Sequence, residues 1–132
     1  MSHYRVLEGN PPDNHQWQPS LEAHLRTFGH APQQASGDRG LYSGSNEQTA
    51  KDLGVRYVIL PKPGYRSKQH KAHEGQEWFV LGRRWHSGVE GRISVLKRAH
   101  GLGRCQDHGW NVFECWVAWG IIAGNLAVMG RA

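Results

Sequence analysis

The chain has 132 residues, 38% of them hydrophobic, which is enough for one modest core and too few for two. Sixteen Lys and Arg against eleven Asp and Glu give a net charge of +5, which favours an anionic partner. The excess is local, because residues 56–104 hold eleven basic and three acidic groups while both flanking parts are slightly negative. A solvated basic face that only aids solubility is the alternative interpretation.

Two features bear on the compartment of the protein. Cys105 and Cys115 are too few for a disulfide framework, and the start Met-Ser-His has no basic stretch followed by an apolar one. A cytoplasmic protein with free thiols is therefore expected. The most apolar run, residues 115–124, is well short of the ~20 residues that a membrane span requires. It predicts a buried helix and no membrane partner.

The beginning of the chain predicts a strand followed by a helix. Residues 3–8 alternate between apolar and polar side chains, and the Gly-Asn-Pro-Pro sequence that follows is typical of a turn. Residues 14–28 repeat large apolar side chains at spacings of three and four, which indicates a helix. Asp13 or Asn14 is expected to cap this helix, and Gly29 to end it.

The next segment predicts two more strands with a helix between them. Asp38, within Gly-Asp-Arg-Gly, is expected at the end of a short strand, where two glycines suit a sharp turn. Residues 46–53 are helix-like, and residues 55–60 form the clearest strand pattern of the chain. Three strands alternating with helices predict an α/β fold in which helices cover a sheet.

The second half of the chain is expected to be helical after one loop. The basic, His-rich residues 65–75 favour a loop, and residues 76–98 and 107–129 favour two C-terminal helices. The last helix is apolar nearly all round, so its Trp116 and Trp119 are expected in the core. A core-facing stripe on the first helix is predicted at Val89, Ile93 and Leu96.

One acid and one base stand out on the helix at residues 86–98. Glu90 and Lys97 are seven apart, which is two helical turns and the same face. Arg92, Arg98 and Arg104 add positive charge, as suits a carboxylate that holds a metal ion near phosphates. A solvated surface pair is the alternative interpretation of these residues alone.

The block Glu-Gly-Arg-Ile-Ser-Val-Leu-Lys at residues 90–97, followed by the Trp-Val-Ala-Trp-Gly helix, closely resembles the C-terminal region of DDE transposases from bacterial insertion sequences. In that family, a glutamate separated by six residues from a lysine closes a triad of catalytic acids, and Glu90 and Lys97 match this spacing. The resemblance extends upstream over nearly the whole chain. Asp38 matches the second acid of the family, which follows a central strand.

The resemblance implies an incomplete ribonuclease-H-like domain, one partial catalytic domain over residues 1–132 that lacks the opening strands and the first catalytic Asp. Glu8 is the nearest upstream acid and a poor substitute. Asp38 and Glu90 would hold Mg²⁺ or Mn²⁺, and the chain alone would be inactive in DNA transposition. The missing N-terminal segment or a full-length transposase would be its protein partner. Contacts to DNA are expected from Lys97, Arg83, Arg84, Arg92, Arg98 and Arg104.

This chain departs from the family pattern at two positions, and two other interpretations of its function stay open. The family often has a tyrosine and an arginine where this chain has Arg83 and His86, which puts the handling of the nearby DNA strand in doubt. The pairs His70-x-x-His73 and Cys105-x-x-His108 have spacings seen in zinc sites, so a small zinc-binding module is one alternative. A basic DNA-binding fragment without catalysis is the other.

Overall fold

The computed structural model describes residues 1, 3–106 and 108–130. The chain is mostly helical (61%), with a small parallel sheet of two strands in the described part, so it is α/β in a broad sense. Two compact units are present: residues 8–87 form one, and residues 1–7 with residues 88–132 form the other.

The sheet belongs to the unit of residues 8–87. Strand β1 (Gln34–Ser36) pairs in parallel with β2 (Tyr57–Ile59), and Ala35 lies opposite Val58. The third strand, expected at residues 3–8, is wrong, because this segment is irregular backbone. Before this segment, Met1 accepts at its carbonyl oxygen from the Asn125 side chain at 2.9 Å.

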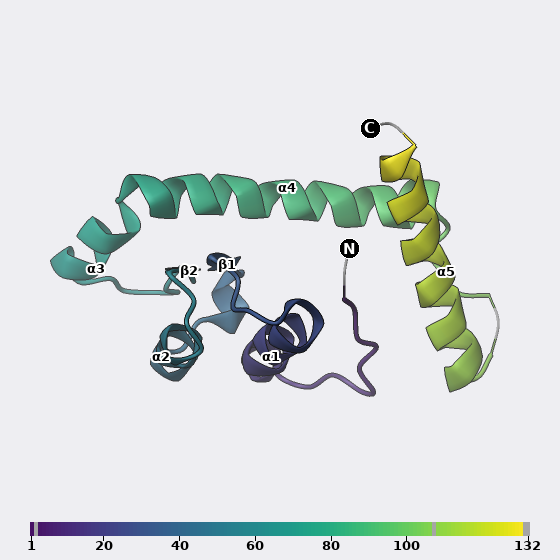
Figure 1. Cartoon of the computed structure of the whole chain (residues 1–132), viewed down its shortest axis with the longest axis horizontal. Coiled ribbons are helices and arrows are strands. Elements are labelled where there is room, and N and C mark those ends of the chain that lie inside the picture. The colour runs from purple at the N-terminus through teal and green to yellow at the C-terminus, as the bar shows by residue number, and fades with distance from the viewer. Residues whose placement is uncertain (2, 107, 131–132) are drawn as a thin grey trace. The chain divides into compact units, whose positions relative to one another are not determined.

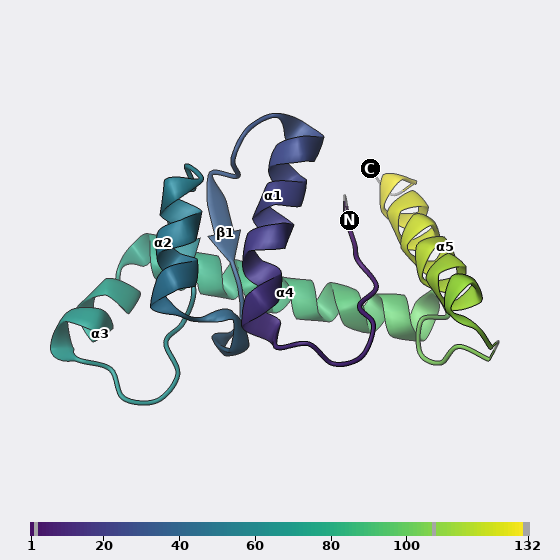
Figure 2. The same ribbon diagram turned by 90° about the horizontal axis from the view of Figure 1, so that it is seen from below.

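Two helices cover one face of the sheet. They are α1 (Trp17–Phe28), preceded by the short 3-10 helix η1 (Asp13–Gln16), and α2 (Gly44–Asp52), which connects the two strands (Figure 2). The predicted helix at 14–28 and its end at Gly29, with φ of 75°, are confirmed. The predicted Asp13 or Asn14 cap is wrong, because no side chain caps α1. The core of this layer consists of Trp17, Leu21, Ala35, Ala50, Val55, Val58 and Leu60.

Asn46 joins α1 and α2. The Trp17 indole donates to the Asn46 carbonyl oxygen at 3.0 Å, and the Asn46 amide donates to the carbonyl oxygens of Asn14 and Leu41, both at 2.8 Å. Ser43 caps α2 by accepting from the Asn46 backbone N–H. One polar residue therefore satisfies loop carbonyls that pack beside the apolar core.

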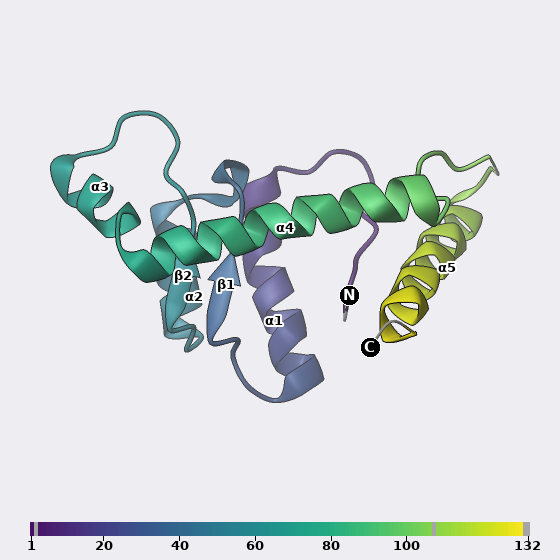
Figure 3. The same cartoon turned by 90° about the horizontal axis from the view of Figure 1, so that it is seen from above.

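The first half of helix α4 (Glu77–Ala99) covers the opposite face (Figures 1 and 3). Phe79 and Ile59 are both fully buried, and Gly82 of α4 is buried next to Ile59. A Cβ on Gly82 would lie 2.7 Å from two side-chain atoms of Ile59, so only glycine fits. Since β2 directs Val58 to one layer and Ile59 to the other, this unit has three layers, as alternation along a buried strand requires.

The expected loop at residues 65–75 is wrong, because it contains helix α3 (Lys68–Glu74). Ser67 caps this helix by accepting from the His70 backbone N–H at 3.2 Å. At the other end, Glu74 is only 5% exposed and accepts from the Lys62 backbone N–H at 2.9 Å and from the Arg66 guanidinium at 2.7 Å. The helix forms because it carries the acid that satisfies the segment after β2.

The other unit holds the second half of α4 and helix α5 (Trp110–Met129), so the two predicted C-terminal helices are confirmed; Asp107 lies outside the described residues. Leu96 packs at Gly124, but the predicted core stripe fails at Ile93, which is 42% exposed. The prediction of a buried α5 is also wrong, because Trp119 is 70% exposed.

By length and composition, α5 is the one helix in the described part that could cross a membrane, with a mean hydropathy of 1.6 over its most apolar window. Only 11% of that window is buried within the chain. Such a helix is weak grounds for a membrane span, since core helices pass the same test.

Candidate functional site

Asp38 lies just beyond the carboxyl end of β1, as expected from the sequence. Only Gly37 separates it from Ser36, and it is exposed at the start of the 3-10 helix η2 (Arg39–Leu41). Its Oδ1 accepts from the Leu41 backbone N–H at 3.2 Å, which fixes the carboxylate at the turn and leaves Oδ2 able to ligate a cation. Loops at the carboxyl ends of parallel strands are where α/β proteins place their ligand-binding residues.

A second carboxylate, missed by sequence reasoning, lies at the same turn. Asp13 Oδ2 and Asp38 Oδ1 are 3.1 and 3.4 Å from the position that a Cβ on Gly40 would take. The contact joins η1 to η2, which are more than twenty residues apart in sequence. Asp13 was assigned only a capping role from its place before a helix, and no local pattern could have paired it with Asp38.

The end of β1 also contacts α4. Ser36 Oγ and His86 Nδ1 lie 3.4 Å apart, a long hydrogen bond in which the proton position depends on the His tautomer. His86 is thus held at the sheet edge from which the Asp38 turn leaves. It stands where the resembling family often has an arginine.

Helical geometry places four polar residues along one side of α4. At about 100° per residue, Arg83, His86, Glu90 and Lys97 fall within an arc of roughly 60°. Phe79, which is fully buried, belongs to the same side of the helix. Glu90 and Lys97 are both exposed. The predicted helix that puts this acid and this base on one face is confirmed, and their roles at a metal ion and at DNA stay predictions.

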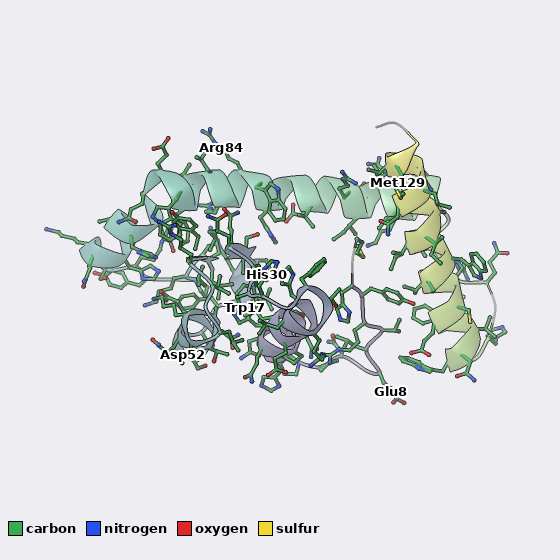
Figure 4. All side chains as sticks on the ribbon, in the orientation of Figure 1. Glu8, Trp17, His30, Asp52, Arg84 and Met129 are labelled. Carbon is green, nitrogen blue, oxygen red and sulfur yellow. The ribbon has the colours of Figure 1, made fainter. Side chains whose placement is uncertain are left out.

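The six predicted DNA contacts do not share one direction. All six side chains are exposed, and within the described residues none of them forms an ion pair. Arg92 follows Glu90 by two residues and so lies about 200° around the helix. Arg84 is directed away from the sheet and from Trp17 (Figure 4). Arg104 lies in the turn between α4 and α5.

Glu74 is a buried acid of this unit, and it lies beside His70, one of the histidines of the proposed zinc pair His70-x-x-His73. Burial alone would raise the pKa of Glu74, but the Lys62 N–H and the Arg66 guanidinium outweigh it and hold the pKa below its ordinary value. His70 Nε2 lies 3.2 Å from Glu74 Oε1, a distance that suits an ion pair when the ring is protonated, although the groups are not aligned for a hydrogen bond. Glu74 is thus a structural acid engaged with cations.

No group of three or more His, Cys, Asp or Glu side chains is arranged to hold a metal ion among the residues that the structure describes. Asp38 belongs to the unit of residues 8–87 and Glu90 to the other unit, so a metal site shared by these two acids stays a prediction. Cys105 and Cys115 are not joined by a disulfide.

The chain matches no protein-family model, no curated protein and no solved structure.

Proposed function

We propose that this chain is the C-terminal part of the catalytic domain of a DDE transposase, and that it acts on the DNA of a bacterial insertion sequence in the cytoplasm. The observation that carries the proposal is the Glu90 to Lys97 block on one face of α4, the spacing that closes the acid triad in the resembling family. Its partners would be DNA and the polypeptide that holds the rest of the domain.

The order of elements supports the proposal. A parallel β1-α2-β2 unit, with Asp38 directly after β1, agrees with a ribonuclease-H-like domain whose second acid follows a central strand. Such a domain has further strands, and a sheet of two three-residue strands is too small to be a complete one. We therefore propose that opening strands from outside these 132 residues add to this sheet.

The resemblance to DDE transposases, in which the acids form one triad, is what pairs the two acids here. Helical geometry adds only that Glu90 and Lys97 share one side of α4. We propose that Glu90 and Asp38 face a common ion, with Lys97 two turns further along binding the DNA backbone. Lys97 is suited to this role because a flexible ammonium binds a phosphate without a fixed orientation.

The donor chemistry fits Mg²⁺ or Mn²⁺, which prefer carboxylate oxygens. Such ions, when bound, activate the attacking oxygen and stabilise the leaving oxygen of a phosphodiester. Asp38 Oδ2 and the Glu90 carboxylate would be protein ligands, while the Leu41 N–H holds Asp38 in orientation. A third carboxylate is expected from the segment that supplies the opening strands, so the 132-residue chain alone should not cut DNA.

The proposal is tested by nicking of a supercoiled plasmid that carries an insertion-sequence end. We expect no cleavage by this chain with Mg²⁺ or Mn²⁺, and cleavage once a polypeptide with the opening strands is added or fused. Glu90→Gln and Asp38→Asn should abolish that cleavage and leave the helical circular dichroism unchanged. Glu77→Gln is the matched control, since Glu77 is an exposed acid on another side of α4.

Two results would contradict the proposal. Cleavage that survives Glu90→Gln in the completed domain would remove Glu90 from the site. Metal-dependent cleavage by the 132-residue chain alone would mean that another acid completes the triad, and Asp13→Asn would then identify whether the neighbour of Asp38 does so. Salt-sensitive DNA binding without cleavage in any combination would instead favour a basic DNA-binding fragment.

A further inference from the structure

The segment that joins β2 to α3 presents an open aromatic ring. Tyr65 is 87% exposed, the highest value among the large hydrophobic side chains of the described residues. It follows the turn at Pro63 and Gly64, where Gly64 has a φ of 67°, the left-handed conformation that favours glycine. Figure 2 shows the segment as an open loop that leads into α3. The faces of the Tyr65 ring are therefore accessible to a flat partner.

The two ends of this loop are held together by one buried acid. The Glu74 carboxylate accepts from the Lys62 backbone N–H at 2.9 Å and from the Arg66 guanidinium at 2.7 Å. Ser67 then caps α3 directly after the loop. Residues 63–65 thus project from a loop whose ends are fixed. A partner that binds a side chain held in this way loses less affinity to the ordering of the loop.

The surface around Tyr65 is cationic. Residues 61–73 contain four Lys and Arg side chains and no Asp or Glu. Lys68 and Lys71 are both exposed and are three residues apart on α3, so they lie about one turn from each other on one side of the helix. Their separation is similar to that of successive phosphates along a nucleic-acid strand. One ring and two cations are thus presented by the same short segment.

Two acids of the neighbouring helices are already paired with cations. Glu74 is 5% exposed, and Arg66 holds it in an ion pair. Glu47 of α2 borders a pocket beside Ser67, and its carboxylate accepts from Lys51 at 2.8 Å. The segment therefore keeps its positive charge, which selects an anionic partner.

An open ring beside two cations matches unpaired nucleotides. Any base can stack on a tyrosine ring, and lysine ammonium groups bind phosphates without a fixed orientation. In a duplex the bases are stacked on each other, so the ring favours a single strand. We propose that Tyr65, Lys68 and Lys71 form a binding surface for single-stranded nucleic acid, with a base on the ring and phosphates on the lysines. The proposal goes beyond the transposase assignment and does not depend on it.

A membrane and an acidic peptide are poorer partners for this surface. The segment offers one large exposed apolar side chain, Tyr65, whereas an element that binds a membrane surface needs a whole apolar face. An acidic peptide would use the lysines alone and would leave the ring in water. A nucleotide strand uses both kinds of group.

The test is fluorescence anisotropy of the 132-residue chain with labelled oligothymidylate, oligouridylate and a DNA duplex. We expect Tyr65→Ala to raise the dissociation constant for single strands about five- to a hundredfold, as loss of a stacked base does. Binding of the duplex should be nearly unchanged. Tyr65→Phe keeps the ring and should bind like the unchanged chain. Phe28→Ala is the matched control, because Phe28 is an aromatic of the same unit that is 46% exposed outside this segment.

The lysines are tested by the salt dependence of single-strand binding. Lys68→Gln combined with Lys71→Gln should reduce the slope of log affinity against log salt by about 1.4 or less, since each phosphate contact to a single strand contributes about 0.7. Arg26→Gln combined with Lys51→Gln removes the same charge from exposed positions of α1 and α2 and should leave the slope unchanged.

Three results would overturn the proposal. They are the absence of saturable binding to either single strand, full affinity in Tyr65→Ala, and equal changes of slope in the two double variants. Tighter binding of polyglutamate than of either strand would replace it with a site for an acidic peptide. Binding of oligothymidylate, of oligouridylate or of both, lost in Tyr65→Ala, supports the surface and identifies DNA, RNA or single strands in general as its partner.

Discussion

The contact of α4 with the sheet predicts that Gly82→Ala is harmful although alanine is the better helix former. The substitution adds one methyl group where Ile59 Cδ1 and Cγ1 already lie 2.7 Å away. Ile59 is fully buried and cannot turn aside. Overpacking of this kind costs about 1–3 kcal/mol, whereas replacing glycine in a helix gains about 1 kcal/mol. The net loss should reach up to about 2 kcal/mol.

Gly88→Ala is the matched control, because Gly88 is in the same helix and no atom lies within 4 Å of its added Cβ. The gain in helix propensity is the same, so Gly88→Ala should stabilise by about 0.5–1 kcal/mol. Urea denaturation followed by circular dichroism measures both free energies of unfolding. The difference between the variants then reports packing alone.

The Ile59 side chain supplies a further check. Ile59→Val removes one of the two contacting atoms, so it should recover part of the loss in the Gly82→Ala background although it destabilises the unchanged chain by about 0.5–1.5 kcal/mol. If Gly82→Ala stabilised the chain as much as Gly88→Ala does, the close approach of α4 to β2 would be wrong.

Three further predictions follow from other contacts. Glu74→Gln should lower the free energy of unfolding at neutral pH by about 1–3 kcal/mol. Because the pKa of Glu74 is depressed in the folded state, the carboxylate stabilises the fold above the unfolded pKa of ~4.3, and this stabilisation is lost as pH falls through the folded pKa. The free energy of unfolding, measured by urea denaturation at a series of acidic pH values, should therefore depend less on pH in the variant than in the unchanged chain. Asn46→Ala should cost about 1–3 kcal/mol by thermal denaturation, since two loop carbonyls lose their donor, and a neutral result would show that water replaces it. Neutralising Arg92, Lys97 and Arg98 together should reduce the slope of log affinity for duplex DNA against log salt by about three units or less, and an unchanged slope in anisotropy titrations would make the basic helix a solvated face.

The parts of the fold that follow from local pattern could be predicted from the sequence. The helix predicted at residues 14–28 from apolar spacing and a terminal glycine is present as Trp17–Phe28, and the helix predicted at 76–98 is present as Glu77–Ala99. The strand predicted at 55–60 is present but shorter, over Tyr57–Ile59. Asp38 was expected after a strand for the same reason. Glu90 and Lys97 share a face because a helix repeats every 3.6 residues.

The parts that depend on distant contacts could not be predicted. Helix α3 forms around Glu74, whose partner Lys62 is twelve residues away, and a polar His-rich segment gives no sign of this. Apolar spacing at Trp119 indicates that a helix face seeks a partner but not whether the same chain provides one. The neighbour of Asp38, Asp13, is brought in by the meeting of two short 3-10 turns.

The shortness of the sheet has a consequence for the order in which the protein folds. β1 and β2 are three residues each and are joined through α2, so they can pair as soon as residues up to about 60 have left the ribosome. The outward-facing amides of such short strands should exchange with deuterium within the first labelling times, because only alternate residues of a strand bond to its single neighbour. Protection of these amides on adding another polypeptide would report strand addition residue by residue, without any requirement for catalytic activity.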